Sequence, residues 1–108
     1  MAVSPDAVVT VSSPAGKREL SPKSEAHAKL EAWMAANQYG WSQYLATPPV
    51  RGVRVFAPGF DLQFIDSTVL VHTTAGYASK SVAPDEYAFL TVDAGERIYS
   101  SSRLRDSP

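Results

Sequence analysis

The chain has 108 residues, of which 44% are hydrophobic and 19% charged, and its formal net charge is −1. These values are typical of one globular domain, and the near-neutral charge gives no reason to expect binding to nucleic acid or to an anionic membrane. The absence of cysteine excludes disulfides, thiolate catalysis and cysteine-ligated zinc. Because no basic leader and no apolar run of membrane-spanning length is present, we expect a soluble, cytoplasmic protein.

The first element expected is a strand over residues 7–12, where β-branched residues predominate. Ser13-Pro14-Ala15-Gly16 should end it, and residues 17–21 should lead irregularly into the next element. A flexible tail over residues 1–20 is the alternative. At the two ends of the chain, residues 1–6 and 101–108 are expected to be flexible.

The stretch from Pro22 to Trp41 is the only one with a sustained helical period. Ser21 is expected as the N-cap, with Pro22 at the first helical position and Gly40 as the left-handed residue that ends the helix. One face of this helix carries Ala26, Leu30, Trp33, Met34 and Asn37. A single apolar stripe of this kind needs a flat layer to cover it.

From residue 50 onward the hydrophobic period changes to two, and turn residues separate successive β-rich segments. Lys80 and several serines indicate that the segment 77–82 is a short or edge strand. In the segment 86–92 apolar residues would occupy both faces of a strand, as expected of a central strand covered on two sides. Strands are predicted over residues 53–56, 60–64, 68–73, 77–82, 86–92 and 97–100, with a hairpin loop over 93–96.

The predicted fold class is therefore α+β, as a single domain over residues 1–108. One amphipathic helix packs on a curved antiparallel sheet of about five to six strands, in the order strand, helix, meander. This order resembles the architecture of the cystatins and of monellin. The Gln-x-Val-x-Gly inhibitory motif of cystatins is absent, so the resemblance implies a fold and no activity.

Catalytic and cofactor motifs are at background level. His27 and Glu31 have the i,i+4 spacing that could face one metal ion, but nothing in the sequence places a third ligand from Asp61, Asp66 or His72 nearby. Such a pair also occurs readily by chance on a solvated helix face, and this is the interpretation we favour. There is no Gly-x-Ser-x-Gly elbow and no glycine-rich phosphate loop. We therefore expect neither an enzyme nor a metal or other cofactor.

One local group of residues stands out as a candidate binding site. Tyr39, Trp41 and Tyr44 lie close together after the helix, and Arg51 and Arg54 follow the Pro48-Pro49 pair. Tyrosine, tryptophan and arginine are enriched in protein-binding hot spots, because they combine a large rigid area with a polar group. The alternative is that these aromatic side chains close one end of the core.

The sequence therefore predicts a small, non-enzymatic protein-binding module whose partner is another protein, with an inhibitor or immunity-like role. Homo-oligomers are also possible. One alternative is a small-ligand site between helix and sheet, lined by Met34, Phe60, Phe64 and Tyr87. The other is a subunit of a larger assembly that joins by strand addition along residues 77–82.

Overall fold

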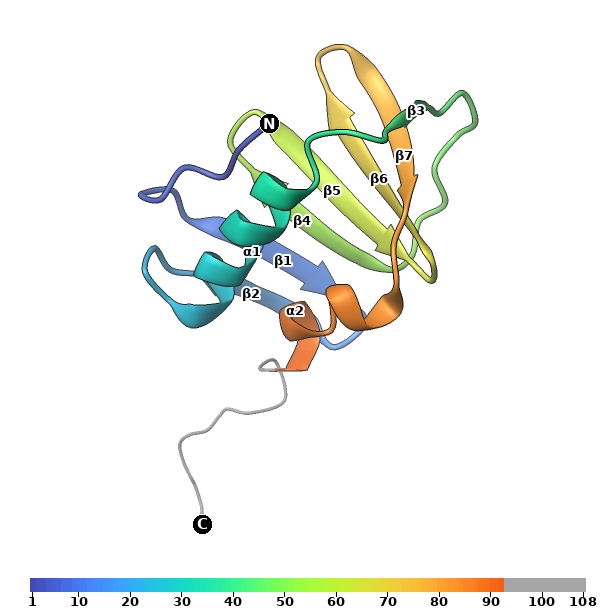
Figure 1. The fold of residues 1–108 in the computed structure, drawn as a ribbon. Helices are drawn as coiled ribbons and strands as arrows, with labels where there is room; N and C mark the ends of the chain where they lie inside the picture. Colours follow the sequence, from blue (N-terminus) through green and yellow to red (C-terminus); the bar gives the residue numbers. More distant parts are fainter. Residues whose placement is uncertain (93–108) are drawn as a thin grey trace.

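Seven antiparallel strands form one open sheet in the computed structural model, which describes residues 1–92 (Figure 1). The sheet order is β2-β1-β4-β5-β6-β7-β3, so β2 and β3 form its two edges. The predicted α+β class is confirmed, but the expected number of five to six strands was too low. The strands are β1 (Val9–Ser13), β2 (Gly16–Leu20), β3 (Ser42–Gln43), β4 (Val53–Ala57), β5 (Phe60–Ile65), β6 (Thr68–Thr73) and β7 (Gly76–Ser81).

The helix α1 (Glu25–Ala36) lies across one face of this sheet, as Figure 1 shows. Ala26, Leu30, Trp33 and Met34 are buried, so the predicted apolar face is the face that packs. The short helices η1 (Pro84–Glu86) and α2 (Phe89–Val92) follow β7 and bring Leu90 into the same core. The strand residues of this core include Val9, Val11, Val53, Val55, Phe60, Leu62, Phe64, Val69 and Val71.

Alternation along β4, β5 and β6 divides the side chains between two faces. Val55, Leu62 and Val71 lie opposite one another in register and point into the core beneath α1. Their sequence neighbours point to the other side, which we call the outer face. The strands predicted over 53–56, 60–64 and 68–73 agree with the structure: the first two carry a period of two, and the third is rich in β-branched residues.

The helix begins three residues later than the sequence predicted. Lys23 has a left-handed backbone (φ 72°), and Ser24 N–H donates to the Ser21 carbonyl at 3.1 Å, so Ser21–Ser24 forms a turn with Pro22 at its second position. Ser24 is the N-cap, and its Oγ accepts a hydrogen bond from the His27 N–H. The predicted N-cap at Ser21 is wrong, because Pro22 fits the second position of a β-turn as well as it fits the first position of a helix.

The helix also ends earlier than Gly40. Its C-cap is Asn37, whose side-chain amide donates to the Trp33 carbonyl at 2.8 Å. The Gln38 amide donates to the Met34 carbonyl, and the Trp41 indole N–H donates to the Asn37 carbonyl. These side chains satisfy the last helical carbonyls, so the chain leaves the helix without a glycine.

The N-terminal region is more ordered than the flexible-tail alternative supposed. β1 lies between β2 and β4, and Val9 and Val11 are buried. Most of residues 17–21, expected to be irregular, belong to β2, which pairs with β1 from Val9↔Leu20 to Ser13↔Gly16. The polar sequence of β2 suits an edge strand, and only its pairing with β1 distinguishes it from a loop.

The predicted central strand over 86–92 is wrong, because that segment forms the end of η1 and the helix α2. Apolar residues on both alternations also suit a short buried helical segment, and periodicity alone does not separate the two. Glu86 fixes the turn: one carboxylate oxygen accepts from the Ala83 N–H at 2.9 Å and the other from the Trp33 indole at 3.2 Å. The loop predicted over 93–96, the strand over 97–100 and the flexible end at 101–108 lie outside the described residues.

The chain takes a long path between α1 and β4. β3 pairs with β7 at the far edge of the sheet, through Ser42↔Ser79 and Gln43↔Ala78. β7 therefore has a neighbour on each side, so it is not an edge strand, which was one of the two expectations (short or edge) for residues 77–82. In the sheet order β4 lies three strands away from β7, beside β1. The residues between β3 and β4 must therefore return past β7, β6 and β5. We call residues 44–52 the crossing segment.

Candidate functional site

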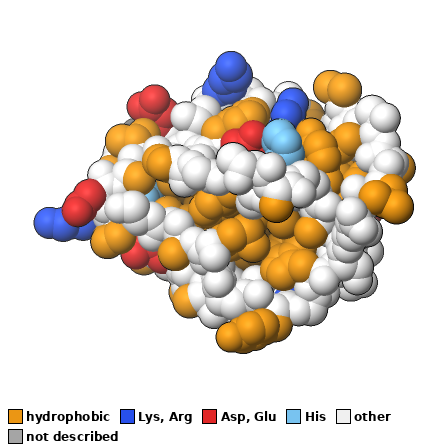
Figure 2. All heavy atoms as spheres, turned by 90° about the horizontal axis from the view of Figure 1, so that it is seen from above, with side chains coloured by type: hydrophobic (Ala, Val, Ile, Leu, Met, Phe, Trp, Pro, Cys, Tyr) orange, Lys and Arg blue, Asp and Glu red, His pale blue; other side chains and the backbone are white. Residues whose placement is uncertain are grey.

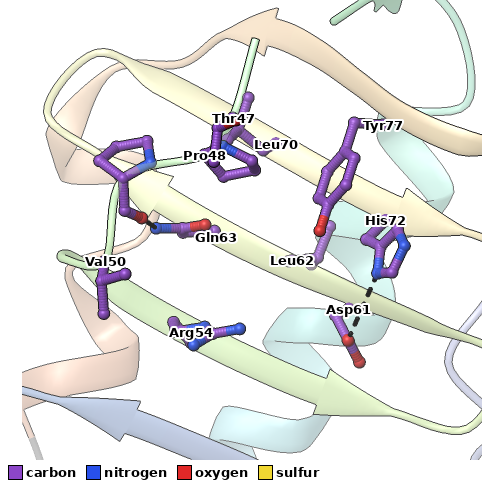
Figure 3. Close-up of a pocket in the computed structure, with 11 residues that line it drawn as sticks. Thr47, Pro48, Val50, Arg54, Asp61, Leu62, Gln63, Leu70, His72 and Tyr77 are labelled. Carbon is purple, nitrogen blue, oxygen red and sulfur yellow. Dashed lines mark hydrogen bonds and ion pairs between the residues drawn. The ribbon is translucent and has the colours of Figure 1, made fainter. Parts of the chain in front are cut away.

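The crossing segment lies over the outer face of the sheet. Gln63 points to this face from β5, and its side-chain amide donates to the carbonyls of Pro49 and Arg51, the latter at 2.8 Å. Gln63 is only 8% exposed as a result. Figure 3 shows Thr47, Pro48 and Val50 passing over the strands that carry Gln63 and Leu70. The segment therefore leaves one hollow on each of its sides.

The first hollow, which we call the Tyr77 hollow, has a volume of about 230 Å³. His72 and Tyr77 are directly opposite on β6 and β7, and their rings stack with centroids 4.2 Å apart. His72 Nδ1 lies 4.0 Å from an Asp61 carboxylate oxygen (Figure 3). Together these side chains form a row of polar and aromatic groups across three strands. The hollow is lined by Thr47, Pro48, Pro49, Val50, Arg54, Asp61, Leu62, Gln63, Leu70, His72 and Tyr77.

Arg54 and Asp61 bring unlike charges to this hollow. The Arg54 guanidinium lies over the Phe56 ring, 5.2 Å from its centroid. It makes no ion pair with Asp61, whose 4.0 Å contact is with His72. The hollow is therefore bordered by a cation and an anion that do not neutralise each other directly.

The second hollow, which we call the Asp66 hollow, lies beyond Pro49 and Leu70 and has a volume of about 380 Å³. Arg51 Nη1 donates to an Asp66 carboxylate oxygen at 3.1 Å across its rim. Both of these side chains are exposed, so the pair contributes little to stability. The hollow is lined by Tyr44, Pro49, Arg51, Ile65, Asp66, Ser67, Thr68 and Leu70.

The structure divides the five predicted site residues among three places. Tyr39 is 87% exposed beside the end of α1. Tyr44 and Arg51 line the Asp66 hollow, whereas Arg54 lines the Tyr77 hollow. Trp41 is half-buried and packs against the core.

Trp41 is tied to the core by several contacts. Its ring meets Trp33 edge-on at 6.4 Å between centroids, and its indole N–H donates to the Asn37 carbonyl at 2.8 Å. The Lys80 amine lies 5.9 Å from the centre of the Trp41 ring and donates to the Tyr39 carbonyl at 2.7 Å. These contacts fix the start of the segment that leads from α1 into β3, while the Tyr39 side chain stays exposed.

Sequence reasoning missed the two most exposed aliphatic side chains of the crossing segment. Leu45 is 84% exposed and Val50 is 92% exposed. The available signal was the presence of apolar residues beside Pro48-Pro49, where no periodic element could bury them. The stacked pair of His72 and Tyr77 could also have been found, because a tight turn between their two strands places them opposite each other.

Apolar surface is also present at one end of the two layers. Figure 2 views the molecule from above, so it shows the end at which α1 leads toward β3. Hydrophobic side chains gather in the hollowed middle of this view, and most charged side chains lie toward its rim. This end of the molecule therefore exposes apolar surface that charged side chains border.

The residues expected to line a pocket between helix and sheet are packed instead. Met34, Phe60 and Phe64 are buried, and Tyr87 stacks on Phe64 at 4.7 Å between centroids. The Tyr87 hydroxyl donates to the Asp66 carbonyl at 2.9 Å. The two hollows described above lie on the opposite face of the sheet.

His27 does not lie on a solvated face. Its side chain is 0% exposed, and Nε2 donates to the Ala7 carbonyl at 2.6 Å, while Nδ1 lies 2.7 Å from a Glu31 carboxylate oxygen. The residue therefore connects α1 to the segment that precedes β1. Within residues 1–92, no three histidine, cysteine, aspartate or glutamate side chains gather in a way that could hold a metal ion.

The fold and the site together define a two-layer α+β domain with a proline-stiffened segment laid across the outer face of its sheet. Comparisons with protein-family models, with curated proteins and with solved structures give no match. None of the described helices has the length and apolar character required to cross a membrane.

Proposed function

We propose that this chain is a non-enzymatic protein-binding module that contacts its partner through the crossing segment and Tyr39. The observation that carries the proposal is the exposure of Leu45 and Val50, at 84% and 92%, on a segment anchored to the sheet through Gln63. Exposed apolar side chains on an anchored segment gain affinity on burial and lose little conformational entropy.

The two hollows beside the segment extend the same surface. Tyr44 and Arg51 line one of them, and Arg54 lines the other. A partner side chain seated in either hollow would be bordered by charged groups and by the apolar surface of Leu70. This arrangement, with apolar anchors among polar groups, is typical of protein-binding surfaces. An inhibitor or immunity-like role for a cytoplasmic protein remains part of the proposal.

The test uses affinity capture with three baits: the unchanged protein, Leu45→Asp/Val50→Asp, and Val8→Asp. Val8 is also an exposed aliphatic residue, at 51%, but it lies before β1 rather than on the crossing segment, so it is the matched control. We expect a protein that binds the unchanged bait and the Val8 variant, and whose affinity falls at least about tenfold for the double variant. Equal capture by all three baits would refute the proposed surface.

Once a partner is in hand, Tyr39 and Tyr44 provide a finer test. Each alanine variant should lose about 1 kcal/mol or more of binding free energy, measured by calorimetry. Tyr39→Ala should leave the urea unfolding midpoint nearly unchanged, because its side chain is exposed. If both variants bind normally, these tyrosines are not part of the interface.

A second candidate function is the binding of a small ligand in the Tyr77 hollow. The observation that favours it is the unneutralised pair of Arg54 and Asp61 beside an aromatic stack. Such a site suits a small molecule that carries both charges and an apolar part. Arg54→Ala and Asp61→Asn should each abolish ligand-induced changes in His72 and Tyr77 NMR signals. Changes that persist in both variants would exclude this candidate.

A further inference from the structure

The free edge of β2 has a charge pattern that is complementary to itself. β2 consists of five residues, and it forms the edge of the sheet next to β1. Lys17 and Glu19 are exposed and point to the same face, since they are two residues apart on a strand. Among the described residues, no strand pairs with the other side of β2.

The hairpin geometry decides which backbone groups of β2 face outward. Ser13 and Gly16 flank the turn at Pro14 and Ala15 and pair directly. A turn of this length closes with a hydrogen-bonded pair, and successive residues then direct their backbone groups alternately toward and away from the neighbouring strand. Lys17 and Glu19 therefore direct their N–H and C=O groups to the open edge.

Two β2 strands can pair antiparallel in several registers. Only one of them brings the outward-facing N–H and C=O groups together and also places unlike charges opposite each other. With Arg18 opposite Arg18 of a second copy, Lys17 lies opposite Glu19, and each such pair exchanges two backbone hydrogen bonds. A register centred on Lys17 or on Glu19 places like charges opposite each other, which is destabilising. A register shifted by one residue places residues whose backbone N–H and C=O groups face outward opposite residues whose groups face inward, so the hydrogen bonds cannot form.

In this register the two Arg18 residues lie opposite each other, but their like charges do not prevent the pairing. Arg18 alternates to the face that carries α1, away from Lys17 and Glu19, and it is half-buried. Its Nε atom is buried. The side chain thus folds against its own domain, and the charges that project at the open edge are those of Lys17 and Glu19.

We infer that two copies of this chain associate through their β2 strands, with a two-fold axis at Arg18 and the two sheets continuous. The occupant of the edge is a second copy because the unlike charges of β2 match under the two-fold operation that a closed homodimer requires. A contact along one short strand is small, so the dimer is weak and depends on protein concentration. This surface is separate from the crossing segment and does not depend on the proposed function.

The test is sedimentation equilibrium of four proteins up to about 1 mM, a range chosen for a small interface. They are the unchanged chain, Lys17→Glu, Glu19→Lys, and the double exchange Lys17→Glu/Glu19→Lys. Each single change places like charges opposite each other at both symmetric pairs, and we expect a dimer at least about tenfold weaker. The double exchange restores unlike pairs and should return the dissociation constant to within about threefold of the original.

Two further measurements make the result decisive. Lys23→Glu changes an exposed charge of the same sign in the turn before α1, and it should leave the dimer unchanged. Thermal melts of all variants should coincide, which shows that the hairpin is intact. A monomer at every concentration would overturn the inference. So would a dimer that the single changes leave intact, or a double exchange as weak as the single ones.

Discussion

Replacing His27 with alanine should destabilise the fold strongly, because its side chain is buried and does not lie on the solvated helix face that the sequence predicted. The ring is fully buried and holds the Ala7 carbonyl at 2.6 Å and the Glu31 carboxylate at 2.7 Å. Its removal leaves the carbonyl without its partner, at a cost of about 1–3 kcal/mol. The space left by the ring adds a cavity penalty, as in other large-to-small changes, for which totals are about 2–5 kcal/mol.

We therefore expect His27→Ala to lower the free energy of unfolding by about 3 kcal/mol. In a domain of this size the thermal midpoint should fall by about 12–24 °C. The measurement is equilibrium urea unfolding, followed by circular dichroism, with the slope compared between variants to confirm that only stability has changed.

The second histidine provides the matched control. His72 is exposed on the outer face and stacks on Tyr77, so His72→Ala should cost less than about 1 kcal/mol. A loss of less than about 1 kcal/mol for His27→Ala, or equal losses for both histidine variants, would show that the His27 contacts do not hold α1 to the N-terminal segment.

The remaining predictions concern the core and the turns. Leu30→Ala and Leu62→Ala should each destabilise by about 2–5 kcal/mol in urea melts, because both side chains are buried between helix and sheet. Gly52→Ala should lower the thermal midpoint far more than Gly59→Ala. Both glycines have positive φ, but a Cβ at Gly52 would collide with the Phe64 carbonyl, whereas at Gly59 it would meet open space. Trp41→Ala should cost about 1–3 kcal/mol of stability, since it removes the edge contact with Trp33 and the hydrogen bond to the Asn37 carbonyl.

The parts of the fold that the sequence determined are those with a strong local signal. β4 and β5 were predicted because their side chains alternate, and β6 because it is rich in β-branched residues; Val55 and Leu62 are buried as expected. The apolar face of α1 was predicted for the same reason, since its residues recur at the helical period. Such patterns reflect one-sided burial of a regular backbone, which the sequence records residue by residue.

Local propensity failed where two structures fit the same residues. Pro22 suits both the first turn of a helix and the second position of a β-turn, and the turn formed. The apolar segment 86–92 suits a central strand or a short buried helix, and the contact between Glu86 and Trp33 accompanies the helical form. Contacts with α1, which lies more than fifty residues earlier in the chain, are invisible to a local pattern.

The site shows the same division between local and tertiary information. Composition drew attention to Tyr39 and to the arginines beyond Pro48-Pro49, but it could not show that the segment crosses the outer face. That path follows from the pairing of β3 with β7 and of β4 with β1, which places the ends of residues 44–52 on different parts of the sheet. Strand pairing is set by the whole sheet rather than by neighbouring residues. Only the tertiary structure could therefore place the crossing segment over Gln63.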